Sequence, residues 1–451
     1  MKVPKKMGVA LLASAAATLL VGTIHGKNPA RSADPTADTL PQDIYPDSRN
    51  RLPLPKREDM SPEDQKIFDD LTRKSDLPVG IEQPGVRLWD PKLAKDTNDV
   101  GHYLKYETGL PDPLLEIAVL VAARELDCQY EWTQWETHGR DPKDPRHIDP
   151  AIIDIIKYEK PVTGLGEKEA AIITFGRETF GARMVSSETF ANVMRLFGRK
   201  GTIDLLWLMG NYSAAAAELT AFDNHLRADQ KPLLPPIAHP RNPARFAAAA
   251  ANPLPADIYP DSRNRLPLPN REQMDAEGQK IFDELNRKSE LPVGIEQPEV
   301  RVWDPKLAKP LAATSHYLKY ETGLPNRLLE IAVLVTAREL DCQYEWTQWE
   351  THGRDPKDPR HIEPELIDII KYEKPVVGLG EKETAIIKFW RETFGQRKVS
   401  SETFAQVLSL FGRKGTVYLL WVMANYSAAA AELIAFDNQL RADQKPLLPA
   451  R

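Results

Sequence analysis

The fold is decided by residues 114–140, which read LLEIAVLVAARELDCQYEWTQWETHGR. Apolar residues recur there at intervals of three and four, which is the period of an α-helix rather than the alternation of a strand. Gly139 and the proline-rich run after it, DPKDPRHIDP, are signals that end a helix. The spacing predicts one long helix over 114–140. A second interpretation lets Asp127 cap a fresh helix, because aspartate is a favoured N-cap residue.

The chain around this stretch consists of one sequence unit that occurs twice in tandem. Residues 40–236 align with residues 254–450 at a constant offset of 214, without a gap. The connecting residues 237–253 are rich in proline and alanine, which is typical of a semi-rigid linker. A unit of this length suits an autonomous domain rather than a short solenoid repeat. The sequence therefore predicts two tandem domains, repeat 1 (40–236) and repeat 2 (254–450).

The helical period extends through most of each repeat. In repeat 1, Ser61 and Pro62 form a typical helix start. No segment shows the sustained alternation of a strand. The sequence predicts an all-α fold with six to eight helices in each repeat. Besides 114–140, the helices expected in repeat 1 cover 62–74, 91–106, 152–159, 167–180, 187–197 and 202–226.

Residues 1–33 have the layout of a targeting segment. Three lysines at the start precede the apolar run 7–24, and small residues follow. This layout is typical of a secretory signal peptide, and the run is also long enough to act as an uncleaved anchor. The sequence predicts an exported protein, periplasmic or secreted. The segment holds five basic residues and no acidic one, so its removal would change the net charge from -6 to -11.

Composition narrows the class of partner. The chain has 59 Lys and Arg against 65 Asp and Glu, so it lacks the basic balance that nucleic-acid binding normally needs. Only two cysteines occur, which excludes a disulfide framework. The segment HGRDPKDPRH contains metal-ligand residue types without a standard zinc spacing, so we expect no metal. Small molecules are the expected partners, and nucleic acid is not.

The predicted long helix carries the candidate chemistry. If it is continuous, it gathers a thiol, two carboxylates, an imidazole and a guanidinium within about a third of its circumference. If a fresh helix starts there instead, Cys128 lies at its N-terminus, where the helix dipole lowers the pKa of a thiol. Both arrangements allow a reactive thiol. The residues of this face are Glu116, Arg124, Cys128, Glu131, Trp135 and His138.

Structural interpretations of the same residues stay open. Cys128 can also be interpreted as a small buried hydrophobic residue, with Trp132 and Trp135 as aromatic residues of the core. His138 lies near the predicted helix C-terminus, where a histidine can interact with the last carbonyl groups. Glu116 lies in an otherwise apolar run, so its burial would require partners.

The stretch ELDCQYEWTQWETHG, behind an apolar helix with Glu116, resembles the carboxymuconolactone decarboxylase and alkylhydroperoxidase AhpD-like superfamily. The resemblance covers about 114–226 and 328–440. In the peroxidase branch the pattern is Glu, eleven residues, Cys, two residues, Cys, three residues, His. The residues at these positions here are Glu116, Cys128, Glu131 and Trp135, and in repeat 2 Glu330, Cys342, Glu345 and Trp349.

The departures from the pattern limit what the resemblance implies. Glu131 occupies the place of the resolving cysteine, so two-cysteine peroxidase chemistry within one site is excluded. A one-cysteine peroxidase, restored by an outside thiol, remains compatible with the pattern, with Glu116 or His138 moving protons. The decarboxylase branch implies proton transfer on a small organic acid or lactone, with His138 in place of the family histidine. The family works without a cofactor.

The sequence thus predicts an exported enzyme acting on a small organic acid, a lactone or a peroxide. The alternative is a noncatalytic binding or assembly protein that keeps the fold after losing the family histidine. Family members form symmetric homo-oligomers, so the fused repeats are expected to pair within the chain as a pseudo-dimer, which leaves further homo-oligomers open. The candidate site residues are Glu116, Cys128, Glu131, His138, Glu330, Cys342, Glu345 and His352.

Overall fold

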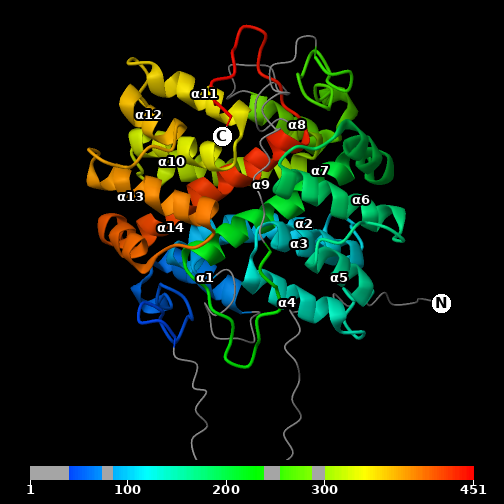
Figure 1. Cartoon of the computed structure of the whole chain (residues 1–451), viewed down its shortest axis with the longest axis horizontal. Coiled ribbons are helices and arrows are strands. Elements are labelled where there is room, and N and C mark those ends of the chain that lie inside the picture. The colour runs from blue at the N-terminus through cyan, green and yellow to red at the C-terminus, as the bar shows by residue number, and fades with distance from the viewer. Residues whose placement is uncertain (1–39, 74–84, 238–253, 287–299, 451) are drawn as a thin grey trace, which may run out of the picture.

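The computed structural model describes residues 40–73, 85–237, 254–286 and 300–450. Within these ranges the chain is built from α-helices, short 3-10 and π segments and one isolated β-bridge, so the predicted all-α class is confirmed (Figure 1). The predicted signal segment, and the linker apart from its first residue, lie outside the described residues. The assignment of two tandem domains stays a prediction.

The helices of the two repeats follow one another in the same order. Repeat 1 holds α1 Pro62–Thr72, α2 Pro91–Tyr106, α3 Asp112–Glu125, α4 Gln129–Arg140, α5 Pro150–Lys157, α6 Glu167–Gly176 and α7 Ser187–Ala221. Repeat 2 holds α8 Ala276–Asn286, α9 Pro305–His316, α10 Asn326–Glu339, α11 Gln343–Arg354, α12 Pro364–Lys371, α13 Glu381–Trp390 and α14 Ser401–Ala435. The predicted start of α1 is confirmed, because the Ser61 side chain accepts a hydrogen bond from the Asp64 amide.

The prediction of one continuous helix over 114–140 is wrong. Helix α3 ends at Glu125, and Asp127 adopts a left-handed conformation with φ 53°. Aspartate tolerates this region better than most residues, because its short polar side chain can bond locally. A fresh helix does begin there, but its N-cap is Cys128 rather than Asp127, with φ -80° and ψ 91°. Repeat 2 breaks in the same way at Asp341, with φ 52°.

The two helices predicted over 187–197 and 202–226 form the two arms of α7. The arms meet at a bend at Gly198, whose φ of 69° and ψ of 178° favour glycine. The second arm ends at Ala221 instead of 226, and Asp223 follows with a positive φ of 49°. The helix predicted over 167–180 ends as α6 at Gly176 and continues as a π segment, Arg177–Ala182.

The repeats are interlocked around α7 and α14. Helices α3–α6 and α10–α13 lie on opposite sides of the molecule, while α7 and α14 pass between them and pack on each other (Figure 1). Small residues permit this contact: a Cβ atom added to Gly210 would lie 3.4 Å from the Cβ of Ala428.

Each main hydrophobic core takes residues from both repeats. Phe222 of repeat 1 lies in the core of repeat 2, edge-on to Phe404 with 5.5 Å between ring centroids. Phe436 lies in the core of repeat 1, 5.4 Å from Phe190. This exchange ties the end of each long helix to the other half of the molecule.

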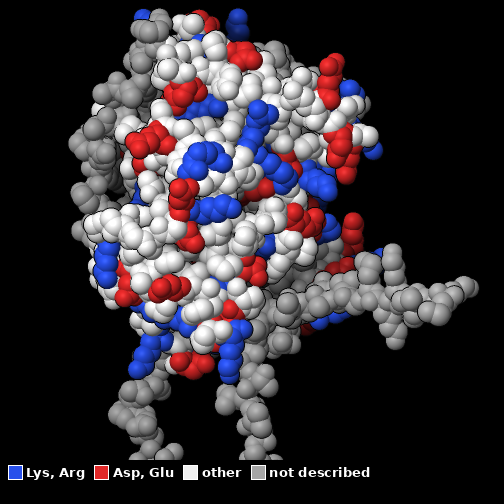
Figure 2. Space-filling view, turned by 90° about the vertical axis from the view of Figure 1, so that its right-hand side faces the viewer, with Lys and Arg blue, Asp and Glu red and all other residues white. Residues whose placement is uncertain are grey.

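Helix α14 is long and apolar enough to cross a membrane by length and composition, and 89% of its most apolar window is buried inside the protein. That degree of burial fits a core helix. On the face of the molecule in Figure 2, basic and acidic side chains are interspersed.

Candidate functional site

Glu116 is a buried carboxyl group inside the α3–α4 pair. Its side chain is 0% exposed, and neither carboxyl oxygen has a hydrogen-bond partner. A Cβ atom added to Gly139 of α4 would lie 3.1 Å from Glu116 Oε1, so glycine leaves the space that this carboxyl group fills. Burial raises the pKa of Glu116 to about 9, although the charge of Arg146 opposes the rise. Glu116 is therefore protonated at neutral pH.

Glu131, in the first turn of α4, is a second buried carboxyl group. It is buried in the same way, and both of its oxygens lack a hydrogen-bond partner. Burial raises the pKa of Glu131 well above its ordinary value, against the opposing charges of Arg87 and Lys105. Repeat 2 reproduces the pair, since burial raises the pKa of Glu330 to about 9 and that of Glu345 to about 8. Burial thus favours the neutral form of two acids in each repeat.

Tyr212 of α7 lies near both acids, and the sequence interpretation missed it. Burial, followed by the charges of Glu131 and Glu116, raises the pKa of Tyr212 well above its ordinary value. Its ring lies edge-on to Trp135, with 5.2 Å between centroids. The hydroxyl of its counterpart Tyr426 is buried without a hydrogen-bond partner.

Arg146, which follows α4, is the cation whose charge most strongly opposes the rise in the pKa of Glu116. Its guanidinium carbon lies 5.3 Å from the centre of the Trp135 ring, and its Nη2 atom lies 2.8 Å from Asp144 Oδ2. Although burial opposes it, the hydrogen bonds from Arg146 lower the pKa of Asp144 to about 2. An ionised, partly exposed Arg146–Asp144 pair therefore lies beside Glu116.

His138 lies at the rim of the site, where its Nδ1 atom is 2.9 Å from Asp144 Oδ2. Its side chain is 28% exposed. Burial and the charge of Arg146 lower the pKa of His138, although Asp144 opposes them. His138 thus pairs with Asp144 instead of binding the last carbonyl groups of its helix. His352 pairs with Asp358 in the same way, at 3.0 Å.

The thiols do not lie in a polar site. Cys128 is 4% exposed and packs with Ala216 and Leu219. Burial, followed by the charge of Glu131, raises the pKa of Cys128 well above its ordinary value, and the amide groups of Tyr130 and Glu131 only partly oppose this. Cys342 lies in the equivalent cluster with Ala430 and Leu433. The interpretation of Cys128 as a buried hydrophobe matches these surroundings best.

Arg124, the cation of the predicted helical face, also lies apart from the acids. Its guanidinium binds the carboxylate of Asp127 and the carbonyl oxygen of Pro235, the latter at 2.7 Å. The break at Asp127 separates the α3 residues from the α4 residues of that face. Tyr212 lies within the electrostatic reach of both Glu116 and Glu131, and Arg146 with Asp144 links Glu116 to the rim histidine. Cys128 lies beside Glu131 in an apolar cluster, and Arg124 binds other groups.

We expect Cys128 and Cys342 to react slowly with a maleimide in the folded protein at pH 8. The reaction should be on the order of 100-fold slower than in the denatured chain, since it requires local opening. Stopped-flow labelling followed by mass spectrometry measures both rates. A Ser61→Cys variant, with its thiol at an exposed helix start, serves as the fast control. A native rate for Cys128 that matched the control would show a reactive thiol.

A buried ion pair lies behind Glu131 and uses a side chain of the other repeat. Arg87 Nε is 2.9 Å from Glu218 Oε2, and the indole nitrogen of Trp421 donates to the same oxygen at 2.6 Å. The Arg87 guanidinium also covers the Trp421 ring at 4.4 Å. The same arrangement recurs with Arg301, Glu432 and Trp207. In each repeat, the ion pair next to the buried acids thus contacts a tryptophan of the opposite repeat.

No cluster of three or more His, Cys, Asp or Glu residues that could hold a metal ion occurs in the part of the chain that the structure describes. Comparisons with protein-family models, with curated proteins and with solved structures find no match to this chain. The family resemblance of residues 114–226 and 328–440 stays a prediction.

Proposed function

We propose that each repeat is a proton-transfer site for a small organic acid or lactone, of the decarboxylase type that the family resemblance implies. The observation that carries the proposal is the pair of buried carboxyl groups without hydrogen-bond partners, Glu116 and Glu131, beside the buried phenol of Tyr212. Burying unpaired polar groups costs stability, and strongly perturbed acids are concentrated at functional sites. A raised pKa suits a carboxyl group to donate a proton near neutral pH.

The roles follow from position. Arg146 at the partly exposed edge would bind the carboxylate of a substrate, and Trp135 with Tyr212 would cover its apolar part. When the bond to the leaving carboxylate breaks, CO2 departs and its electron pair stays on the substrate carbon. Glu116 would deliver a proton to that carbon. Solvent would then return a proton to the Glu116 carboxylate through His138. Glu131 would act as the second acid or base.

Two other functions are supported less well. A one-cysteine peroxidase needs a thiolate, and the burial of Cys128 opposes its ionisation. A noncatalytic binding or assembly protein would have no use for two unpaired acids in each repeat. Export, and pairing of the repeats in place of a two-fold homodimer, remain part of the proposal. The hydrogen bonds between Trp421 and Glu218 and between Trp207 and Glu432 support the pairing.

A screen of carboxylic acids, lactones and peroxides with the purified chain tests the proposal. The Glu116→Gln, Glu330→Gln double variant should lose 10²- to 10⁴-fold in turnover, roughly the value of a general acid. The Cys128→Ser, Cys342→Ser double variant should keep the wild-type rate. Glu188→Gln with Glu402→Gln, exposed acids at the starts of α7 and α14, is the control.

Each other outcome of the screen points to a different function. Peroxide consumption that is lost only in the cysteine variant would establish the peroxidase. No turnover with any compound would favour the noncatalytic alternative. Unchanged turnover in the Glu116→Gln, Glu330→Gln variant would contradict the proposed role of these acids.

A further inference from the structure

The two repeats meet at two equivalent contacts, and in each a helix-capping aspartate of one repeat binds side chains of the other. Asp304 of repeat 2 is the N-cap of α9. Tyr103 of α2 donates a hydrogen bond to Asp304 Oδ2, and Lys200 Nζ of α7 lies 2.9 Å from the same oxygen. Lys200 Nζ also lies 2.6 Å from Oδ2 of Asp204, which is one turn further along α7. We call Tyr103, Lys200, Asp204 and Asp304 the acidic contact.

The equivalent contact carries a tyrosine in place of Asp204. Asp90 of repeat 1, the N-cap of α2, accepts a hydrogen bond from the Tyr317 hydroxyl at 2.5 Å. Lys414 Nζ lies 3.5 Å from the same carboxylate oxygen, and the Tyr418 hydroxyl lies 3.2 Å from that of Tyr317. These four residues, which we call the phenolic contact, lie 214 positions from those of the acidic contact, and only the Asp204/Tyr418 position differs.

Two carboxyl groups meet in the acidic contact, and such a contact needs a proton. The side chains of Asp204 and Asp304 are both buried and lie within hydrogen-bonding reach of each other. Asp204 Oδ1 accepts no hydrogen bond from the described residues. Because two ionised carboxylates repel, neighbouring acids hold one proton between them. Tyr418 instead brings a phenol proton, and burial, followed by the hydrogen bond to Asp90, raises the pKa of Tyr418 above its ordinary value.

Asp204 is the member of the acid pair that releases the shared proton. Burial, followed by the hydrogen bond with Asp304, raises the pKa of Asp204 to about 7. Although burial opposes it, hydrogen bonds with Asp204, Tyr103 and Lys200 lower the pKa of Asp304. The titratable groups of the described helices that face Asp204 are Lys200 on α7, Tyr103 on α2 and Asp304 at the start of α9. Without the proton, two buried carboxylates face one lysine, so the contact carries an uncompensated negative charge.

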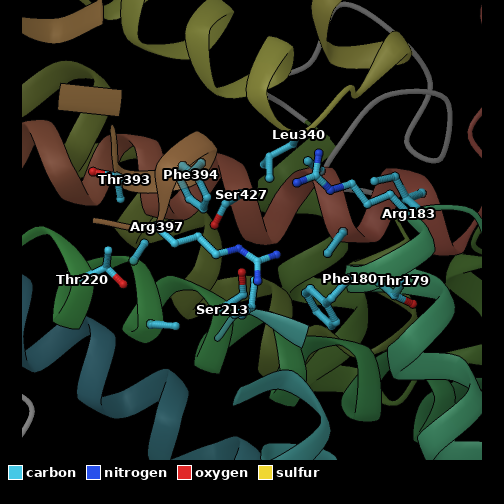
Figure 3. Close-up of a pocket in the computed structure, with 16 residues that line it drawn as sticks. Thr179, Phe180, Arg183, Ser213, Thr220, Leu340, Thr393, Phe394, Arg397 and Ser427 are labelled. Carbon is cyan, nitrogen blue, oxygen red and sulfur yellow. The ribbon is translucent and has the colours of Figure 1, made fainter. Parts of the chain in front are cut away.

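The centre of the interface is held by other residues. Figure 3 shows Arg183 and Arg397, one from each repeat, where α7 and α14 meet. Each pairs with an acid of the other repeat, Arg183 with Asp341 at 3.5 Å and Arg397 with Asp127. The residues around them occur in pairs 214 positions apart, so this region straddles the pseudo-two-fold axis that relates the repeats. The acidic and phenolic contacts lie on either side of that axis, so loosening one of them leaves the repeats joined.

We propose that the acidic contact is a pH-sensitive joint between the repeats, which is closed while Asp204 and Asp304 share a proton and opens when that proton passes to solvent. The phenolic contact has no carboxyl group at the position of Asp204 and stays closed. Opening would expose the first turn of α9, where the Asp304 carbonyl oxygen accepts a hydrogen bond from the Ala308 amide at 2.9 Å. The joint would work whether or not the buried acids Glu116 and Glu131 are catalytic.

Hydrogen exchange of the full chain, followed by mass spectrometry from pH 5 to pH 9, tests the joint. Peptide 304–311 reports on the acidic contact and peptide 90–97 on the phenolic contact, and each rate is compared with the intrinsic exchange rate at the same pH. Because the pKa of Asp204 is raised in the closed state, closure is most favoured at low pH and is lost as the pH rises toward 7. We expect the protection of 304–311 to fall by about tenfold or more between pH 5 and pH 7 and then to level off. The protection of 90–97 should stay constant.

The one position that differs between the two contacts provides matched variants. Asp204→Asn keeps a hydrogen-bond donor that cannot ionise, and Asp204→Tyr copies the phenolic contact, so both should keep 304–311 protected at every pH. Tyr418→Asp should give 90–97 the pH dependence that 304–311 shows in the wild type. The proposal is overturned if the two wild-type peptides respond equally to pH, which would indicate unfolding of the whole chain. It is also overturned if 304–311 does not respond, or if Asp204→Asn loses protection as the wild type does.

Discussion

Replacing Glu116 and Glu330 with glutamine should raise the free energy of unfolding at pH 8 and leave it nearly unchanged at pH 4. In the folded protein burial raises the pKa of each group from 4.5 to about 9. The unfolded chain releases these protons above its ordinary pKa, while the folded chain retains them. The stability that the groups contribute is therefore fully present below pH 4.5 and is lost as the pH rises toward 9.

The size of this effect makes it measurable. Between low pH and pH 8, the raised pKa lowers the free energy of unfolding by something on the order of 4 kcal/mol for each carboxyl group. Glutamine has no charged form, so the variant does not lose this stability. Urea unfolding followed by tryptophan fluorescence from pH 4 to pH 9 should give a shallower slope for the variant. Part of the remaining slope belongs to Glu131, Glu345 and Asp204, because burial raises the pKa of these groups as well.

The exposed pair Glu188→Gln and Glu402→Gln serves again as the control and should follow the wild type at every pH. An equal pH slope in the wild type and in the Glu116→Gln, Glu330→Gln variant would mean that these acids ionise in the folded protein. The assignment of neutral, buried acids to the site would then be wrong.

Replacing Glu218 with leucine should destabilise the protein by about 3 to 5 kcal/mol. The reason is that Arg87, which is 8% exposed, would keep a buried charge without its carboxylate. The indole N–H of Trp421 would lose its acceptor as well. Thermal and urea unfolding measure the loss.

A double variant separates the charge from the packing. Arg87→Met with Glu218→Leu replaces both ions by apolar groups and should cost much less than Glu218→Leu alone. The exposed pair of Arg195 and Glu167 is the matched control, since its side chains are 58% and 72% exposed and its removal should cost less than about 1 kcal/mol. A cost for Glu218→Leu as small as that of the control would show that the buried pair contributes little.

Local signals in the sequence were sufficient for the helices but not for the break between α3 and α4. The cap at Ser61 depends on neighbouring residues, so the pattern predicts it. The turn at Asp127 interrupts a stretch whose helical period continues on both sides, and only the left-handed backbone of one residue distinguishes it. The pattern therefore allowed either one continuous helix or a fresh helix that starts near Asp127, and it did not decide between them.

The site could be predicted only in part, for a similar reason. Glu116 was identified because an acid in an apolar run is unusual, and Glu131 because it shares the predicted helical face with Glu116. Tyr212 comes from a helix far along the chain, and the surroundings of Cys128 depend on Ala216 and Leu219 of that same helix. Trp421 comes from the other repeat. The 214-residue offset shows that the unit occurs twice, but not that each copy contributes to the other's interior.

The exchange of Phe222 and Phe436 between the two cores has a consequence for synthesis on the ribosome. Phe436 leaves the ribosome 214 residues after Phe222, which corresponds to roughly 10 to 40 seconds at ordinary elongation rates. During that time the first half of the nascent chain has all its own helices but lacks the aromatic ring that completes its interior. A delay in translation between the repeats would prolong the exposure of this unfinished core to chaperones and proteases.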